Sequence, residues 1–234
     1  MRRALIVVAK RPVNGQTKTR LTPPFTPHQA TALYECLLRD TLELMTQVEG
    51  VQPILAYAPE DAAPYFRSIC PAAFELCPQC GADLGARLHN ALTHALAQGY
   101  RQAVIMDSDS PTLPPAYLRQ AFAHLDEAGT DVVLGPCDDG GYYLIGLKEP
   151  CAALFDITMS TPTVLQQTLA AADAASRRAA LLPTWYDVDT VEEVERLRAE
   201  LAADPAAFAP RSRAMLPSLS WSAGVPLPSR NKTE

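Results

Sequence analysis

The feature that most constrains the fold is a regular alternation between short apolar runs and longer amphipathic segments. Residues 4–9 form a continuous apolar run, which is typical of a strand buried on both faces of a parallel sheet. A loop that contains several Pro and Gly residues follows. Residues 27–48 then repeat apolar side chains every three or four positions, which predicts an amphipathic helix with Thr26 as its N-cap.

The same alternation continues to residue 203. Strands that alternate with helices favour a parallel sheet, because each crossover helix returns the chain to the same edge. The sequence therefore predicts one α/β domain over residues 1–203, with a mostly parallel central sheet and helices on both faces. We expect further strands at residues 53–57, 103–106, 131–135 and 142–147, and further helices at residues 61–69, 84–97, 115–128, 163–175 and 191–203.

The end of the chain differs in composition from this domain. Residues 204–234 carry several Pro residues among Ser and Arg, which predicts an irregular C-terminal tail. Such a segment offers little apolar surface to bury. We therefore expect that removal of the residues after Ala209 leaves the fold intact.

The charge balance limits the classes of partner. The 20 Lys and Arg residues against 26 Asp and Glu residues give a net charge of −6, which disfavours general attraction to nucleic acid or an anionic membrane. No apolar run approaches the roughly 20 residues that cross a bilayer, and we expect a cytoplasmic protein. The six Cys residues are scattered, and the pair Cys77 and Cys80 lacks the second pair of ligands that a structural zinc site needs.

A basic loop follows the first predicted strand. It carries four cations, among them Lys10, Lys18 and Arg20, on either side of Gly15. Open α/β sheets bind ligands at this edge. Gly15 permits a close approach of the backbone, while Lys18 and Arg20 can pair with anionic oxygens. We interpret the loop, with Ala9 at its start, as a phosphate site; a solvated basic loop without a ligand is the alternative.

Two carboxylates lie at the end of the predicted strand 103–106. Asp107 and Asp109 form a D-x-D pair, and such a pair suits a hard divalent ion, Mg²⁺ or Mn²⁺, that also bridges the phosphates of a ligand. Capping of the helix that follows Pro114 is the alternative for Asp109. The basic loop expected along the same edge favours the metal.

Two further stretches bring polar groups to this edge. Asp139, Gly140, Gly141 and Tyr142 lie between two apolar runs. A tight turn accounts for the Asp-Gly pair, and a sugar or acceptor pocket is the second interpretation. Asp187 precedes the last predicted helix, for which Asp189 or Thr190 is the expected N-cap. Asp139 and Asp187 are therefore candidates for a general base, and Asp187 also for a distant metal ligand.

Five ordered motifs together resemble a known family. They are Ala9-Lys10-x-Pro12-x-x-Gly15-x-x-Lys18-Thr19-Arg20-Leu21, Asp83-Leu84-Gly85-x-Arg87-Leu88, Asp109-x-Pro111-x-Leu113, Gly135-Pro136-x-x-Asp139-Gly140-Gly141-Tyr142 and Asp187-Val188-Asp189-Thr190. A chain with these motifs from about Leu5 to Leu201 resembles the bacterial DUF2064 group of GT-A-like proteins, which are often described as arsenosugar-biosynthesis-type glycosyltransferases.

The resemblance implies a fold and a set of site residues. The fold is the Rossmann-like GT-A fold of nucleotide-diphospho-sugar transferases. The resemblance places Lys18 and Arg20 near the phosphates and Asp109 at the metal, and it adds Asp83 and Arg87 to the substrate-binding residues.

Two positions depart from the family pattern. Asp107 stands where related proteins often have Gly, which completes the D-x-D pair but can also crowd the site. Met159 stands where they often have Trp, on the side where the acceptor is expected.

The activity implied is transfer of a sugar from a nucleotide-diphospho-sugar to a small acceptor, with a divalent metal that stabilises the departing diphosphate. Nucleotidyl transfer of the guanylyl or cytidylyl type to a phosphorylated acceptor is the alternative, because similar Lys-x-Arg-Leu starts occur in such enzymes. A noncatalytic nucleotide-binding protein is the third hypothesis. The nucleotide base, the sugar, the acceptor and the oligomeric state stay open, and His89 is a further candidate for the general base.

Overall fold

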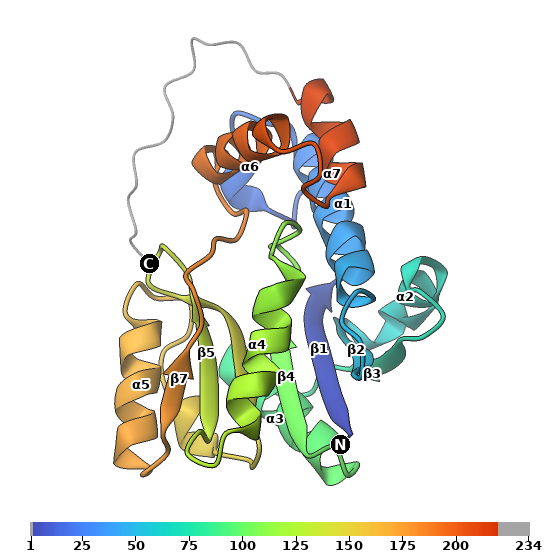
Figure 1. Ribbon diagram of the computed structural model, residues 1–234. Helices are drawn as coiled ribbons and strands as arrows, with labels where there is room; N and C mark the ends of the chain where they lie inside the picture. The colour runs from blue at the N-terminus through green and yellow to red at the C-terminus, as the bar shows by residue number, and fades with distance from the viewer. Residues whose placement is uncertain (1, 220–234) are drawn as a thin grey trace.

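The computed structural model describes residues 2–219, and a seven-stranded sheet forms its core (Figure 1). The strands are β1 (Arg3–Lys10), β2 (Gln52–Ala58), β3 (Glu75–Pro78), β4 (Gln102–Met106), β5 (Val132–Pro136), β6 (Tyr142–Leu147) and β7 (Ala179–Leu181). Their order in the sheet is β3-β2-β1-β4-β6-β5-β7. Of these strands, β6 is antiparallel to both of its neighbours and the others run parallel. The predicted α/β fold with a mostly parallel sheet is confirmed.

The reversal of β6 follows from the turn that precedes it. The Cys137 amide donates to the Gly141 carbonyl at 2.9 Å, and the Gly140 amide donates to the Cys137 carbonyl at 3.2 Å. Gly140 has a φ of 90°, and a Cβ there would lie 2.0 Å from the Pro162 carbonyl oxygen, so this position needs glycine. The turn leaves the amino end of β6 at the same edge as the carboxyl ends of the parallel strands.

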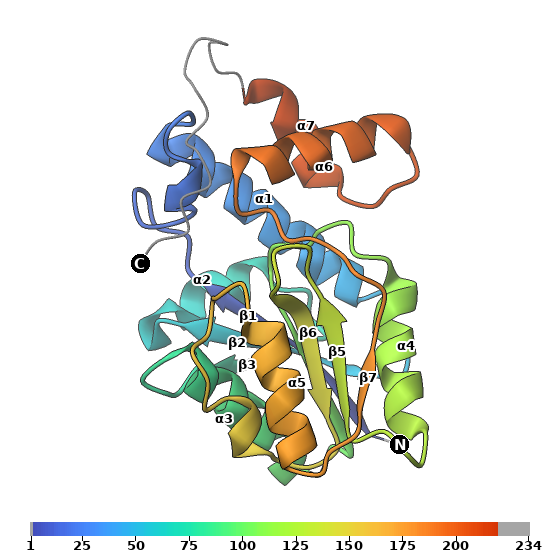
Figure 2. The same cartoon turned by 90° about the vertical axis from the view of Figure 1, so that its left-hand side faces the viewer.

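Helices cover both faces of the sheet, as predicted (Figures 1 and 2). The helices are α1 (Pro27–Met45), α2 (Ala63–Ile69), α3 (Leu84–Ala97), α4 (Pro115–Asp126), α5 (Val164–Ala174), α6 (Val191–Ala203) and α7 (Pro210–Met215), with 3₁₀ turns at Thr19–Leu21, Glu60–Ala62, Ala152–Leu154 and Leu216–Ser218. One apolar cluster joins α1, α2 and α4 to the sheet, and a second joins α3 and α5 to the other face. Alternate residues of β1 divide between the clusters, with Leu5 and Val7 in the first and Ala4 and Ile6 in the second.

Local signals in the sequence explain where two of these helices begin. The Thr26 hydroxyl accepts from the Gln29 amide at 3.2 Å, and the Gln29 side chain accepts from the Thr26 amide at 2.9 Å. This reciprocal pair is a capping box, and it confirms Thr26 as the cap of α1. The Asp83 carboxylate accepts from the Ala86 amide at 2.8 Å and caps α3 in the same way.

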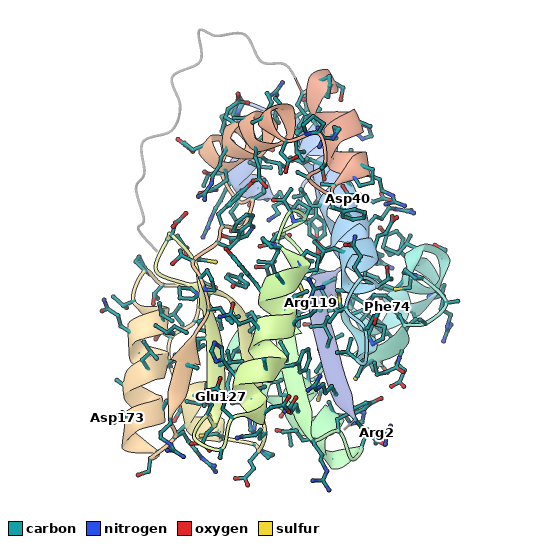
Figure 3. All side chains as sticks on the ribbon, viewed as in Figure 1. Arg2, Asp40, Phe74, Arg119, Glu127 and Asp173 are labelled. Atoms are coloured by element: carbon teal, nitrogen blue, oxygen red, sulfur yellow. The ribbon has the colours of Figure 1, made fainter. Side chains whose placement is uncertain are left out.

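A third layer lies beyond the carboxyl edge of the sheet, where α6 and α7 pack against α1 (Figures 1 and 2). Asp40 of α1 lies where this helix passes α7 (Figure 3). Its carboxylate is fully buried and accepts from the Arg211 and Ser212 amides at 3.1 and 2.7 Å. The Asp40 side chain therefore caps α7 from a neighbouring helix and ties the C-terminal segment to the domain.

This packing corrects the expectation of an irregular tail over residues 204–234. Pro210 takes the first position of α7, where its missing N–H is tolerated. Ala209, Leu216 and Leu219 are at most 3% exposed. The Pro residues suggested irregular chain, but apolar residues between them supply a buried face. Residues 220–234 of the expected tail lie outside the described residues.

Two smaller observations complete the fold. β7 has only three residues, too few to show a period in the sequence, and it is held by parallel pairing with β5. Among the helices described, none is both long and apolar enough to cross a membrane.

Candidate functional site

Four chain segments meet at the carboxyl edge of the sheet. They follow β1, β4 and β5 and precede α6. The last of them, residues 185–189, is drawn into the edge by pairing of Trp185 with Cys137. Two hydrogen bonds also join this segment to the one after β4. The Val188 amide donates to the Asp109 carbonyl at 3.0 Å, and the Ser110 hydroxyl donates to the Tyr186 carbonyl at 3.0 Å. These bonds bring Asp187 and Asp189 next to acids that lie far away in the sequence.

A cavity of about 230 Å³ opens among these segments. We call it the acidic pocket, because four carboxylates line it together with Arg20 and Cys137. Aliphatic, aromatic and thioether side chains complete the lining and form what we call its apolar wall. Its lining residues are Val8, Arg20, Leu84, Leu88, Ile105, Met106, Asp107, Cys137, Asp139, Gly141, Tyr142, Tyr143, Leu144, Ile145, Met159, Ser160, Val164, Asp187 and Asp189.

A second hollow lies at the opposite edge of the sheet. Its volume is about 490 Å³, and Gly99, Gln102, Glu127 and Lys148 are among its lining residues. Figure 3 shows Glu127 at that end of the molecule, away from α6 and α7. The carboxylates and cations singled out in the sequence do not line it, so the acidic pocket is the candidate site.

Lys18 lies behind the wall of the acidic pocket. Its ammonium nitrogen is 2.7 Å from Asp109 Oδ2 and 2.5 Å from Asp189 Oδ1, and its side chain is 6% exposed. Burial alone would lower the pKa of Lys18, but the two carboxylates outweigh it and hold the pKa above its usual range. The backbone of Lys18 is left-handed, with a φ of 50°, a conformation that its ion pairs and packing maintain. Lys18 is therefore a fixed internal cation here.

Arg20 is the cation of the loop that faces the acidic pocket. Its side chain is 66% exposed, and its contact with Asp189 is long, at 3.4 Å. An arginine so placed keeps most of its donors for a ligand. Gly15 and Lys10 are exposed and do not line the pocket, while Ala9 lies inside β1 and is buried. The structure thus separates Arg20 from the other residues expected at the phosphates.

The two acids of the D-x-D pair take different places: Asp107 lines the pocket, and Asp109 lies behind it. Asp107 lines the pocket and accepts from the Asp109 amide at 2.9 Å and the Ser110 hydroxyl at 3.1 Å. Burial, and then the negative charges of Asp109 and Asp187, raise the pKa of Asp107 well above its usual value. Asp109 does not line the pocket, because it turns back to Lys18.

Three potential metal ligands cluster in the acidic pocket. The Cys137 sulfur and a carboxylate oxygen from each of Asp139 and Asp187 all lie within 4.8 Å of one another. Burial, and then the charges of Asp189 and Asp109, raise the pKa of Asp187 to about 7. Burial, followed by the surrounding carboxylates, also holds the pKa of the Cys137 thiol above its usual range. Burial is the largest cause of each of these shifts, and the neighbouring negative charges add to it.

The charge balance supports a divalent ion at this cluster. Between residues 2 and 219 the site gathers five carboxylates and two cations, so a bound cation would relieve the repulsion among its acids. Carboxylate oxygens from several segments suit Mg²⁺ or Mn²⁺, and a thiol adds affinity for softer ions. The residues present therefore fit a divalent metal. The carboxylates are Asp107, Asp109, Asp139, Asp187 and Asp189, and the cations are Lys18 and Arg20.

The other predicted substrate-binding residues take different places. Gly141 and Tyr142 line the pocket, and the Tyr142 hydroxyl lies 3.7 Å from the Met159 sulfur. Gly140 shapes the turn beside them. Asp83 and Arg87 do not line the pocket: Asp83 caps α3, and Arg87 donates to the Gly81 carbonyl at 3.1 Å. Both hold the start of α3, whose Leu84 and Leu88 form part of the apolar wall.

Sequence reasoning missed three residues of the site. Cys137 was grouped with scattered thiols, although its position two residues before Asp139 was a usable signal. Asp189 was considered only as a helix cap, but it pairs with Lys18. Tyr34 gave no signal beyond helical spacing. Its hydroxyl lies 3.1 Å from Ser108 Oγ and accepts from the Lys10 amide at 3.3 Å, so α1 supports two loops of the site.

Known structures share this architecture. A protein of Desulfovibrio desulfuricans G20 with a provisional description as a nucleotide-diphospho-sugar transferase is 29% identical, with a TM-score of 0.84 over 93% of this chain and 95% of that one. A cytidylyltransferase from Leptospira borgpetersenii serovar Hardjo-bovis is 12% identical, with a TM-score of 0.57 over 93% of each chain. Rv0371C of Mycobacterium tuberculosis H37Rv, in complex with manganese, is 19% identical, with a TM-score of 0.51 over 84% of this chain and 98% of that one.

The sequence comparisons agree with this fold. A search of curated proteins finds no match. Residues 41–161, more than half of the chain, match the family described as "Uncharacterized protein conserved in bacteria (DUF2064)". The matched residues include two of the four segments that form the acidic pocket, those around Asp107 and Asp139. With this match and a shared transferase fold, the chain belongs to the DUF2064 family.

Proposed function

We propose that this protein transfers a sugar from a nucleotide-diphospho-sugar to a small acceptor in a metal-dependent reaction. The observation that carries the proposal is the acidic pocket, in which four carboxylates and Arg20 face one cavity at the carboxyl edge of the sheet. Ligands of open α/β sheets bind at this edge. The 29% identity to the D. desulfuricans protein, over nearly the whole of both chains, supports a donor of the nucleotide-sugar class.

The residues that would hold the metal are Asp187 and Asp139, with Asp107 beside them. All three line the pocket, whereas Asp109, the ligand expected from the sequence, is held by Lys18. Asp109 can therefore act on a metal only through this ion pair or after Lys18 moves. When bound, a divalent ion would supply positive charge for the departing diphosphate. The manganese complex of Rv0371C, a protein of the same fold, is consistent with such an ion.

The phosphates would contact Arg20 at the mouth of the pocket. Its guanidinium is exposed and, within residues 2–219, makes one long ion pair, with Asp189, so a diphosphate can take up its remaining donors. Lys18 acts on the reaction indirectly, because it pairs with Asp109 and Asp189 and so leaves Asp107, Asp139 and Asp187 to bind a cation.

The apolar wall would receive the sugar or the acceptor. Leu84, Leu88, Met159 and Tyr142 supply surface against which a ring or a short chain can pack. A carboxylate of the same pocket must accept the proton of the attacking hydroxyl. Asp139 and Asp187 stay the candidates, and Asp107 can take this role if both of them hold the ion, because its pKa is also raised.

Nucleotidyl transfer is the second candidate function. A cytidylyltransferase shares the fold, and the same loop and carboxylates can hold a nucleoside triphosphate. The small size of the pocket favours neither activity. The two are separated by what leaves the enzyme, since nucleotidyl transfer releases diphosphate and glycosyl transfer releases a nucleoside diphosphate.

A thermal-shift panel tests the coupling between nucleotide and metal. Nucleotides and nucleotide-sugars are compared with and without Mg²⁺ or Mn²⁺. A ligand at about a hundred times its Kd should stabilise the protein by about 2.7 kcal/mol. We expect this stabilisation for a nucleotide-sugar with metal and much less without it. A ligand that stabilises equally without metal would favour a noncatalytic nucleotide-binding protein.

A further inference from the structure

We infer that the Cys137 sulfur is a metal ligand beside Asp139 and Asp187, and that the pocket therefore prefers a thiophilic divalent ion such as Zn²⁺ or Co²⁺ to Mg²⁺. This inference deepens the proposed function and rests on it for its biological meaning. The binding site itself rests on the contacts of the three side chains.

The distances fit a shared ion. Bonds from zinc-like ions to sulfur and oxygen are about 2.3 and 2.0–2.2 Å, so two ligands of one tetrahedral ion lie about 3.4–3.6 Å apart. The three ligand atoms here lie within 4.8 Å of one another, and a movement of about 1 Å in the carboxylate side chains brings them onto one ion. Asp139 is exposed and Asp187 half-buried, which leaves a path for an ion from solvent.

The Cys137 side chain is built into the site and lacks a partner of its own. It is 8% exposed and lines the pocket, and its sulfur makes no hydrogen bond to any residue between 2 and 219. A buried cysteine often serves as a small apolar residue in a core. A purely apolar role does not account for a sulfur that shares a cluster with the carboxylates of Asp139 and Asp187.

The backbone holds the three ligands in place before any ion binds. Cys137 and Asp139 lie on one tight turn, closed by the bond from the Cys137 amide to the Gly141 carbonyl at 2.9 Å. The Asp139 carboxylate also accepts from the Gly141 amide at 2.8 Å. Asp187 comes from the segment that pairs with Cys137 through Trp185. Ligands supported on paired backbone segments form a preorganised site.

The sulfur decides which ions the pocket favours. Mg²⁺ demands oxygen ligands in near-octahedral geometry and keeps several waters. Thiolate ligands instead favour Zn²⁺ and related ions. At a site with mixed ligands, the affinity for a divalent ion also rises along the series from Mn²⁺ to Co²⁺. A serine at position 137 would leave an oxygen-only site. The identity of this one side chain therefore sets the preference between soft and hard ions.

Cobalt absorption tests the sulfur ligand directly. The full chain, the Cys137→Ser variant and a Cys77→Ser/Cys80→Ser double variant are titrated with Co²⁺. We expect a thiolate-to-cobalt charge-transfer band in the near ultraviolet for the wild type and the double variant. Cys137→Ser should lose the band while Co²⁺ still binds through the carboxylates. The double variant is the matched control, because Cys77 and Cys80 are a pair of free thiols outside the pocket that could also bind the probe.

Competition between ions tests the selectivity. Zn²⁺ and Mg²⁺ are each used to displace Mn²⁺ from the wild type and from Cys137→Ser. The preference for Zn²⁺ should fall at least about tenfold in the variant, which corresponds to about 1.4 kcal/mol. An unchanged preference would overturn the inference. So would a failure of Co²⁺ to bind, a bound Co²⁺ without the band, or a band that is lost only in the double variant.

Failure of this inference is distinguishable from failure of the proposed function. Turnover of a nucleotide-sugar is measured with Mg²⁺ and Mn²⁺ on the same preparations. Turnover without a charge-transfer band would contradict the sulfur ligand and leave the transfer reaction standing. A band that depends on Cys137, without turnover of any nucleotide-sugar, would establish the metal site and contradict the proposed transfer.

Discussion

The ammonium group of Lys18 lies 2.7 Å from the carboxylate of Asp109, although the two are 91 positions apart in the sequence, and this ion pair lies behind the wall of the acidic pocket. The same ammonium contacts Asp189 at 2.5 Å. Lys18 thus lies between two acids. The sequence alone predicts Asp109 as a metal ligand and Asp189 as a candidate helix cap. The pair defines which carboxylates stay available to a ligand.

Removal of this cation should destabilise the fold. Lys18→Met leaves two partly buried carboxylates without their partner, and we expect a loss of about 2–4 kcal/mol in the free energy of unfolding. Lys10→Met is the matched control, since Lys10 is exposed on the same loop and should change stability by less than about 0.5 kcal/mol. Chemical denaturation measures both. Equal stability of the two variants would show that the buried pair contributes little.

Arg20→Ala should weaken nucleotide binding without unfolding the protein. Because the side chain is 66% exposed and its ion pair is long, we expect a loss of less than about 1 kcal/mol in stability. Its loss from the pocket should lower nucleotide affinity by about tenfold or more. Calorimetry on Arg20→Ala and on Arg39→Ala, an α1 variant outside the pocket, makes the comparison. Equal affinities would remove Arg20 from the site.

Metal affinity should rise with pH and then level off. The pKa of Asp187 is raised to about 7, so a proton occupies this carboxyl at lower pH and competes with the ion. In Cys137→Ser, where no thiol proton has to leave, affinity for Mn²⁺ should therefore increase up to about pH 7 and change little above it. Adding Asp187→Asn should weaken binding and flatten this dependence. Adding Asp109→Asn should keep the dependence but move it to lower pH, because the charge of Asp109 is one of the causes that raise the pKa of Asp187.

The opposite result of this comparison would support Asp109 as the main metal ligand, as the sequence predicts. If Asp109→Asn abolishes Mn²⁺ binding and Asp187→Asn does not, Asp109 is the main metal ligand and Lys18 must leave it when the ion binds. Calorimetry with Mn²⁺ in the presence of a nucleotide-sugar distinguishes the two outcomes.

The C-terminal segment should be required for stability. Asp40 is fully buried and is satisfied by two amides and by Arg211 Nη1 at 3.2 Å, so Asp40→Ala should cost about 3–5 kcal/mol. Glu43→Gln alters only the exposed partner of Arg211 and should cost less than about 1 kcal/mol. Truncation after Ala209 should lower the Tm. An unchanged Tm would restore the view that the tail is dispensable.

The sequence predicts those features of the fold that depend on the local periodicity of apolar residues and on the order of strands and helices along the chain. β1 reads as a buried strand because Leu5 and Ile6 are buried on opposite faces. α1 and α3 show helical spacing and caps at Thr26 and Asp83. Segments that end strands of a parallel sheet must share an edge, so the site could be assigned to that edge without a structure.

What the sequence did not predict depends on pairing between distant residues. Lys18 and Asp189 are 171 residues apart, and nothing in either motif shows that they neutralise each other. The cluster of Cys137 and Asp187 arises from one bridge between Cys137 and Trp185. The sequence does not predict α7, because the Pro residues in and around it indicate irregular chain. Its signal is limited to Ala209, Leu216 and Leu219, three separate apolar residues that pack against other helices.

Analysis of the released product tests the central claim most directly. The protein is incubated with a panel of nucleotide-sugars, Mn²⁺ and small acceptors, and the nucleotide products are separated by chromatography. The account predicts a nucleoside diphosphate that forms only with metal and is lost in Asp187→Asn. Release of diphosphate from a nucleoside triphosphate, with no nucleoside diphosphate from any nucleotide-sugar, would contradict it and identify nucleotidyl transfer instead.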